Sequence, residues 1–292
     1  MGRRGVQVAL GLLWLLDGAL QLQPYMLGRH FATDVIAPAG EGQPRFVASG
    51  VTWAADLVAA HAVAWDLLFA FVQLAIGLGL LVPRLPVVRA ALAASVAWGL
   101  AVWYFGEGLG GLASGDLNLL VGGPGAVLLY VVLALAVWPS TRGAAGTQPP
   151  PAAWLPFAWA VLWLGGALWQ GAPAHDSAGL LADEIRGSAE GAPRWLASFD
   201  RTAATHVLAG DGWIVGGFVA VMVVVGLFGL VAGAPRLVAA ALGILLAAAM
   251  WLLGQSLGEL TTGQSTDPNS GPLLIVMALA LVRAGRPRSR PE

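Results

Sequence analysis

Two aspartates interrupt apolar stretches of this sequence and are its first candidates for chemistry. Asp17 closes the apolar run at residues 12–16, and Gln21 follows one helical turn later on the same face. Asp66 interrupts a second apolar run, which also contains Gln73. A charge at the centre of a bilayer costs on the order of 2.5–3.5 kcal/mol on insertion scales, so a carboxylate kept there predicts a functional site. The alternative is structural: a neutral aspartate bonded to a neighbouring helix, or one that reaches water.

A third carboxylate, Glu107, follows another apolar run, at a point where glycines let the chain leave a helix. A helix end in contact with water is the alternative there. The carboxylates of Asp17, Asp66 and Glu107 would move protons or accept hydrogen bonds from a bound head group, which makes them candidate catalytic residues. The candidate substrate-binding residues are polar or aromatic side chains close to them along the chain, namely Gln21, Gln73, His61 and Trp103.

The composition indicates what must hold these residues in place. Of 292 residues, 58% are hydrophobic and only 11% are charged, whereas soluble domains carry about 25% charged residues. A formal net charge of −1 argues against a nucleic-acid binder, and the lack of cysteine excludes disulfides, thiolate metal ligands and iron–sulfur clusters. The class that remains is a polytopic membrane protein, with the lipid bilayer as its main partner.

Apolar runs near the roughly 20 residues that cross a bilayer predict an all-α integral membrane protein with eight transmembrane helices. The runs cover residues 6–24, 58–82, 87–106, 119–138, 153–171, 212–233, 236–254 and 271–284. Two long connections, at residues 25–57 and 173–211, separate the first helix of each set of four from the other three. We expect short amphipathic helices in them at residues 31–36 and 180–185. A loop packed over its own bundle is favoured over a binding function for both connections.

The arginines predict how the chain is oriented. Ten of the 15 fall at alternate connections, beginning with Arg3 and Arg4, while nearly every carboxylate falls at the others. Short connections rich in arginine stay in the cytoplasm. We therefore expect a multi-pass protein of a bacterial-type plasma membrane, with both termini cytoplasmic and the acidic loops outside.

The sequence also contains an internal repeat. Residues 41–49 recur at 190–198, an offset of 149. Two further matches support it: Pro83-Arg84 with Pro235-Arg236, and the pattern from Trp103 to Gly123-Pro124 with that from Trp251 to Gly271-Pro272. Each copy has an even number of helices, so the copies run parallel. We predict two four-helix units, at residues 1–140 and 153–292, joined by a cytoplasmic linker at 141–152.

The copies differ where the chemistry would lie. At the offset of 149, Gly166 stands in place of Asp17, and at 148 Gln255 stands in place of Glu107. Aligning the copies on their prolines places Asp66 opposite Phe218. These acidic groups therefore belong to the first copy, which favours one site over two and leaves open whether the second copy has its own.

Residues 261–272 combine hydroxyls with Asp267 and Asn269, a set that suits a cation with oxygen ligands. The same residues are typical of a turn ahead of a helix, and we favour the turn. Haem held between His61 and His206 is a minor alternative, because two histidines would have to face each other within the bundle. We predict no metal site.

Two segments resemble the DoxX-like membrane proteins. One is Phe71-Val-Gln73-Leu-Ala-Ile-Gly77-Leu-Gly79-Leu-Leu-Val-Pro-Arg84-Leu with the Ala-rich helix after it, and the other is residues 12–21, an apolar run that ends in a polar cluster. Members of that family are four-helix bundles, some of them membrane subunits of thiosulfate:quinone oxidoreductase or partners in redox-protecting complexes. The resemblance covers residues 6–138 and, more faintly, 153–284, which implies a tandem DoxX-like protein. Gln73 stands where the family often has an acid.

The resemblance and the polar residues together predict a redox-linked, quinone-associated membrane subunit with an outward-facing pocket. Its partners would be the bilayer and a redox or secreted protein at the outer loops. One alternative is a small-solute transporter or permease, and another is a non-catalytic assembly partner for a secreted protein. Beyond a possible quinone, the residues specify no cofactor, and they leave open whether the chain is an enzyme.

Overall fold

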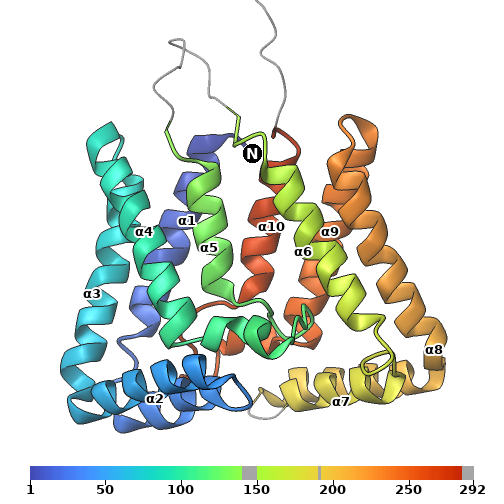
Figure 1. Ribbon diagram of the computed structural model, residues 1–292, viewed down its shortest axis with the longest axis horizontal. Helices are drawn as coiled ribbons and strands as arrows, with labels where there is room; N and C mark the ends of the chain where they lie inside the picture. The colour runs from blue at the N-terminus through green and yellow to red at the C-terminus, as the bar shows by residue number, and fades with distance from the viewer. Residues whose placement is uncertain (140–149, 190–191, 285–292) are drawn as a thin grey trace, which may run out of the picture.

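The computed structural model describes residues 1–139, 150–189 and 192–284, and helices are their main secondary structure. In them 75% of residues are helical and no strand occurs, which confirms the all-α prediction. Figure 1 shows a row of upright helices standing on a horizontal layer, with the N-terminus at the opposite end. The expected linker at 141–152 and the arginines Arg142, Arg286, Arg288 and Arg290 lie largely or wholly outside the described residues.

The first part of the chain, residues 1–139, forms five α-helices and three short helical turns. They are α1 (Arg3–Leu20), η1 (Phe31–Ile36), η2 (Ala37–Gly40), α2 (Arg45–Ala60), α3 (Ala62–Leu81), α4 (Leu85–Phe105), η3 (Gly108–Ser114) and α5 (Ala126–Ala136). The described residues from 150 onwards form α6 (Leu155–Gln170), α7 (Ala178–Ser188), α8 (Arg194–Leu230), α9 (Ala234–Leu253), η4 (Ser256–Glu259) and α10 (Ser270–Leu281). We call these two parts the first and the second half.

Four helices of the described chain are long and apolar enough to cross a membrane. They are α3, α4, the part of α8 at Gly212–Leu230, and α9; α5 and α10 are apolar but shorter. Large apolar side chains on their surfaces are exposed, for example Phe71 at 69% and Leu245 at 67%. Such faces suit lipid better than water, so the structure is that of a membrane protein.

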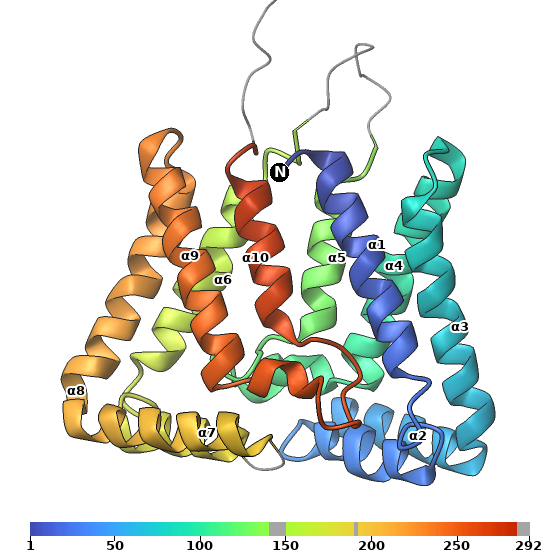
Figure 2. The ribbon, with the colours of Figure 1, turned by 180° about the vertical axis from the view of Figure 1, so that it is seen from behind.

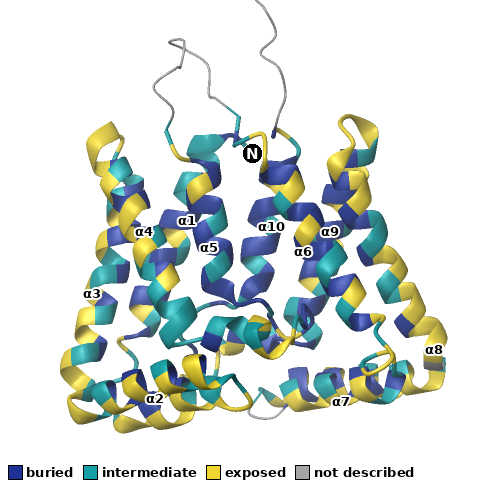
Figure 3. Ribbon diagram, viewed as in Figure 1, coloured by how far each residue is buried: buried dark blue, intermediate teal, exposed yellow. Residues whose placement is uncertain are grey.

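The two halves pack in the same way. α1 lies on α3 and α6 on α8, while α4 lies on α5 and α9 on α10. Figures 1 and 2 show α5 and α10 side by side in the middle, with α3 and α8 at the far edges. Figure 3 shows that buried residues concentrate on these two central helices. The core therefore lies where the halves meet.

Matching glycines bring the paired helices close together. A Cβ on Gly77 would lie 2.7 Å from Leu15 Cγ, and one on Gly226 would lie 2.8 Å from Leu164 Cγ. Both pairs differ by the offset of 149 residues found in the sequence. The same close helix contact is thus built twice, and only a residue without a side chain fits it.

The proline alignment proposed from the sequence is wrong by three residues. Pro86 and Pro235 each occupy the first turn of a helix, α4 and α9, whereas Pro83 precedes α4. Proline is favoured in a first turn because the N–H that it lacks has no partner there anyway. With Pro86 matched to Pro235 the offset is 149, which places the fully buried Val215 opposite Asp66, instead of Phe218.

The horizontal base layer consists of α2, α7 and the start of α8. Helix α7 confirms the amphipathic helix expected at 180–185. The expected helix at 31–36 is a single π-helical turn, and the 16-residue helix α2 was not predicted. Pro44 and Pro193 are the N-cap residues of α2 and α8. Figure 1 shows α8 running along the base and then turning upwards at the edge of the molecule.

Two predicted spans are shorter than expected. The run at 58–82 breaks at His61, whose backbone (φ −143°, ψ 53°) leaves the helix between α2 and α3. The run at 119–138 becomes helical only at Ala126, because the preceding residues 122–125 read Gly-Gly-Pro-Gly and form turns.

Gly77 tests the tight helix contact. We expect Gly77→Ala to destabilise the fold by about 1–3 kcal/mol, the usual cost of overpacking, because its Cβ would lie 2.8 Å from the carbonyl oxygen of Gly11. Thermal unfolding in detergent measures the change. Gly217→Ala is the matched control, since a Cβ there meets nothing within 4 Å. Equal unfolding temperatures for the two variants would show that the contact is not tight.

Candidate functional site

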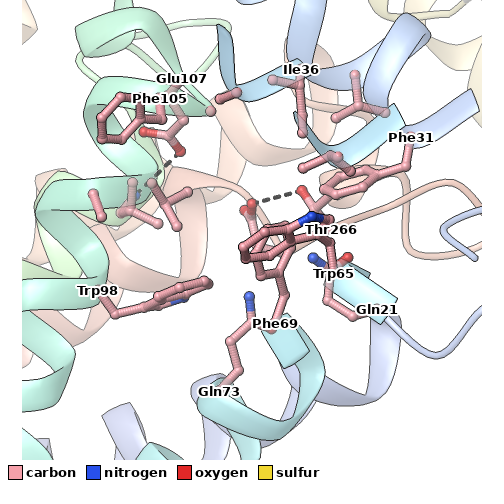
Figure 4. Close-up of a pocket in the computed structure, with 18 of the residues that line it drawn as sticks. Gln21, Phe31, Ile36, Trp65, Phe69, Gln73, Trp98, Phe105, Glu107 and Thr266 are labelled. Atoms are coloured by element: carbon pink, nitrogen blue, oxygen red, sulfur yellow. Dashed lines mark hydrogen bonds between the residues drawn. The ribbon is translucent and has the colours of Figure 1, made fainter. Parts of the chain in front are cut away.

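A cavity of about 340 Å³ lies in the first half, between its upright helices and the base layer. Aromatic rings form much of its wall: Trp14, Phe31, Trp53, Trp65, Phe69, Trp98 and Phe105. Phe69 is central to them, with its ring centre 5.3 Å from that of Trp98 and 6.0 Å from that of Trp65. Figure 4 shows these rings surrounding a space into which polar side chains point. The cavity suits a flat, largely apolar molecule.

Four of the predicted site residues line this cavity: Asp17, Gln21, Gln73 and Glu107. Each has a buried oxygen without a well-formed hydrogen bond from a described residue, namely Asp17 Oδ1, Gln21 Oε1, Gln73 Oε1 and Glu107 Oε2; the hydroxyl of Tyr130 lies beside Asp17. A buried polar atom without a partner costs about 1–3 kcal/mol. Four such atoms around one cavity indicate a binding site whose ligand donates hydrogen bonds.

Helix α1 is fixed against its neighbours near Asp17. The indole Nε1 of Trp14 donates to Ser95 Oγ of α4 at 2.9 Å, and its ring lies 4.3 Å from that of Tyr130 on α5. Trp14 and Ser95 are both buried. Because Asp17 and Gln21 follow within two turns of the same helix, these contacts also set their positions in the cavity.

Glu107 is held by the turn that follows α4. Its Oε1 accepts the backbone N–H of Val127 at 3.4 Å, and Trp103 Nε1 donates to the carbonyl of Pro124 at 2.7 Å. At Gly110 (φ +56°) a Cβ would overlap the carbonyl of Pro124, so the turn and the loop before α5 approach as closely as backbones can.

The second half repeats this arrangement with other residues. Gln255 Oε1 accepts the N–H of Gly271 at 3.1 Å, and Trp251 Nε1 donates to the carbonyl of Pro268 at 2.8 Å. The structural counterpart of Pro124 is therefore Pro268, four residues before the Pro272 matched from the sequence. A shorter loop before α10 explains the shift.

The structure leaves the other three predicted residues outside the cavity wall. Asp66 is fully buried on α3, and neither of its carboxylate oxygens has a partner among the described residues, but it does not line the cavity. His61 lies exposed at the break between α2 and α3. Trp103 joins α4 to the loop before α5 and does not face the cavity.

Two further cavity residues, Thr266 and Asp267, come from the second half. The sequence analysis weighed their segment as a cation site or a turn, but did not connect it with this cavity. Asp267 Oδ1 accepts the N–H of Asn269 at 2.6 Å, and Oδ2 accepts the hydroxyl of Thr266 at 3.0 Å. The segment is therefore a turn, as favoured from its sequence. The only available signal was an acid within a polar stretch between two apolar runs, which does not reveal its distant contacts.

The cavity is acidic and has no basic residue in its wall. Burial, and to a lesser extent the nearby charge of Asp267, raise the pKa of Glu107 to about 8, against the lowering effect of hydrogen bonds from the N–H groups of Val127 and Ala126. Burial also raises the pKa of Asp267. Glu107 is thus largely protonated at neutral pH and able to exchange a proton with a ligand.

Comparison of the chain with protein-family models, curated proteins and solved structures found no match. The DoxX-like resemblance therefore stays a prediction, and the function has to be argued from the cavity.

The raised pKa of Glu107 predicts how stability depends on pH. An acid whose pKa rises on folding, here from 4.5 to about 8, destabilises the fold as pH increases between those values. Each unit corresponds to about 1.4 kcal/mol. We expect the unfolding temperature in detergent to fall between about pH 5 and pH 8, and to fall less in Glu107→Gln, which copies Gln255. Identical pH profiles would contradict the shift.

Proposed function

We propose that this membrane protein is a redox-linked subunit whose outward-facing cavity binds the ring of a quinone-like molecule. The observation that carries the proposal is the set of unpartnered oxygens on Asp17, Gln21, Gln73 and Glu107 around one aromatic cavity. A quinone head group is flat and dissolves in lipid, so it can both reach such a cavity and stack on its rings.

The cavity favours the reduced form, a quinol. Among its lining residues, Gln21 and Gln73 have an unpartnered amide oxygen, which can only accept. Asp17 and Glu107 each have an unpartnered carboxyl oxygen, which accepts when the group is ionised, whereas Trp98 Nε1 is an unpartnered donor. A quinol carries two hydroxyl donors, and a quinone carries only acceptors. Oxidation of a quinol releases two protons along with its electrons, and a carboxylate such as Asp17 can take up a proton as a general base. The two electrons would pass to an oxidised redox protein docked at the outer loops, which is the oxidant that the reaction requires.

We further propose that the chain has eight spans in two parallel units, as a tandem DoxX-like protein would. The matching helix contacts, the equivalent glycines Gly77 and Gly226, and the two tryptophan-to-proline bonds support this duplication. The two shortest of these eight helices, α5 and α10, lie in the middle of the molecule and contact each other. Their neighbours shield them from lipid, so they need not match its thickness.

A small-solute permease is the second candidate. Thr266 and Asp267 of the second half line a cavity of the first, so the cavity lies where the two halves meet. Transporters with repeated units place their substrate sites at such an interface.

The orientation can be tested directly because the chain has no cysteine. We expect a membrane-impermeant thiol reagent to label Glu41→Cys in intact cells and to label Arg84→Cys only after permeabilisation. Both side chains are exposed, at opposite ends of the molecule. The reverse pattern of labelling would place the cavity on the cytoplasmic side.

Asp17 tests the binding proposal. We expect Asp17→Asn to weaken binding of a short-chain benzoquinol up to about tenfold, because the amide presents an NH2 donor to a ligand hydroxyl and a lost hydrogen bond costs about 0.5–1.5 kcal/mol. Quenching of tryptophan fluorescence in detergent measures the affinity. Asp56→Asn is the control, because Asp56 is exposed on α2 and outside the cavity. Unchanged quinol affinity in Asp17→Asn would contradict the proposal, and solute flux in proteoliposomes without quinol binding would favour the permease.

A further inference from the structure

Asp267 lies where three cavities meet. It lines the aromatic cavity and two more, of about 370 Å³ and 480 Å³. Glu107 lines both the aromatic cavity and the 370 Å³ cavity. Thr266 lines both the aromatic cavity and the 480 Å³ cavity. These residues therefore form the partition between the aromatic cavity and its two neighbours.

The two neighbouring cavities are polar and lie among the loops. Side chains around the 370 Å³ cavity include Glu41, Gln43, Asp116 and Asn118. Those around the 480 Å³ cavity include Tyr25, Asp34, Glu259 and Gln264. No lining residue of either cavity is basic. Polar cavities of this size admit water, so we call them the two vestibules.

The loop that carries Asp267 crosses from the second half to the first. Figure 2 shows the segment between η4 and α10 reaching over towards α1 and α2. The contact is direct, because Gln23 Nε2 of the first half donates to the carbonyl of Ser265 at 3.1 Å. Asp267 is thus delivered to the cavity by a part of the chain remote in sequence.

The corresponding loop of the first half crosses in the opposite direction. A Cβ on Gly166, the counterpart of Asp17, would lie 2.3 Å from Leu119 Cδ1. Gln255 Nε2 donates to the carbonyl of Leu120 at 3.3 Å. Leu119 therefore fills the place in the second half that the polar cavity occupies in the first.

We infer that the site is shared between the two halves, and that Asp267 is its proton outlet to the vestibules and the water outside. This inference rests on the proposed function, in which a bound quinol releases protons into the aromatic cavity. The two halves exchange loops: the first half closes the second half's cavity, and the second half supplies an acid to the first half's site.

The groups around Asp267 suit this role. The carboxyl is oriented by Thr266 and by the N–H of Asn269. The titratable groups that interact electrostatically with it are Asp17 on α1, Glu107 after α4, Tyr130 on α5 and Glu259 on η4. All of them are acids and no base lines the three cavities. With no basic side chain in the lining, the cluster loses its charge by taking up protons, and carboxyl groups that interact in this way can pass a proton along.

The route to water can be tested by labelling a cysteine in the partition. We expect Thr266→Cys to react at least tenfold faster with a charged methanethiosulfonate added outside right-side-out vesicles than inside-out ones. Ser95→Cys is the unreactive control, since Ser95 is fully buried on α4. Faster labelling of Thr266→Cys in inside-out vesicles, or no labelling in either kind of vesicle, would contradict the inference that Asp267 is the proton outlet.

A second measurement needs neither a ligand nor a membrane. A pH jump in detergent is expected to change the tryptophan fluorescence of the protein. The part of that change that is absent in Glu107→Gln reports protonation of Glu107. We expect Asp267→Asn to slow that change at least tenfold, Asp267→Glu to restore it, and Asp56→Asn to leave it unaltered. An unchanged rate in Asp267→Asn, with quinol binding intact, would refute the outlet alone. If the unaltered protein does not bind quinol but Asp267→Asn still slows the change, only the proposed ligand is refuted.

Discussion

The structure depends on one costly feature, the burial of carboxyl and amide oxygens without partners inside an apolar helical bundle. Each such atom works against folding, so the surrounding structure must hold it there. Contacts in the cavity wall and beyond it do so: the bond from Trp14 to Ser95, the close approach of α1 and α3 at Gly77, and the apolar centre at α5 and α10. A cavity maintained at that cost is expected to serve binding or catalysis rather than stability.

The exchange of loops explains why one half has the site and the other does not. Both halves build the same helix contacts and the same turn after the fourth and ninth helices. They differ in the side chain that the crossing loop supplies. The second half receives Leu119 from the first, and the first half receives Asp267 from the second. An apolar side chain closes a cavity, whereas an acid keeps it polar and connects it with the vestibules.

The sequence alone was sufficient to predict those site residues whose burial costs free energy wherever their helix packs. Asp17 and Glu107 stand out because an acid within or beside an apolar run is expensive wherever the run packs. Asp66 meets the same criterion, but the cavity wall on α3 is formed by Trp65, Phe69 and Gln73, and Asp66 is buried beside them without lining the cavity. Asp267 could not be predicted, because its position depends on a loop crossing between halves. Helix α2 was missed because its buried apolar residues occupy only one face, so the mean hydropathy of the segment is below that of a membrane span.

The comparison of Glu107 with Gln255 separates structure from chemistry. Both side chains accept a backbone N–H at the start of the next helix, Val127 in one case and Gly271 in the other. The amide therefore fulfils the structural role, and it does so without a titratable group. A carboxyl at 107 adds nothing to that bond and brings the destabilisation of a raised pKa. Because the fold needs only the hydrogen-bond acceptor, the acidity of Glu107 is best explained by the proton chemistry of the cavity it lines.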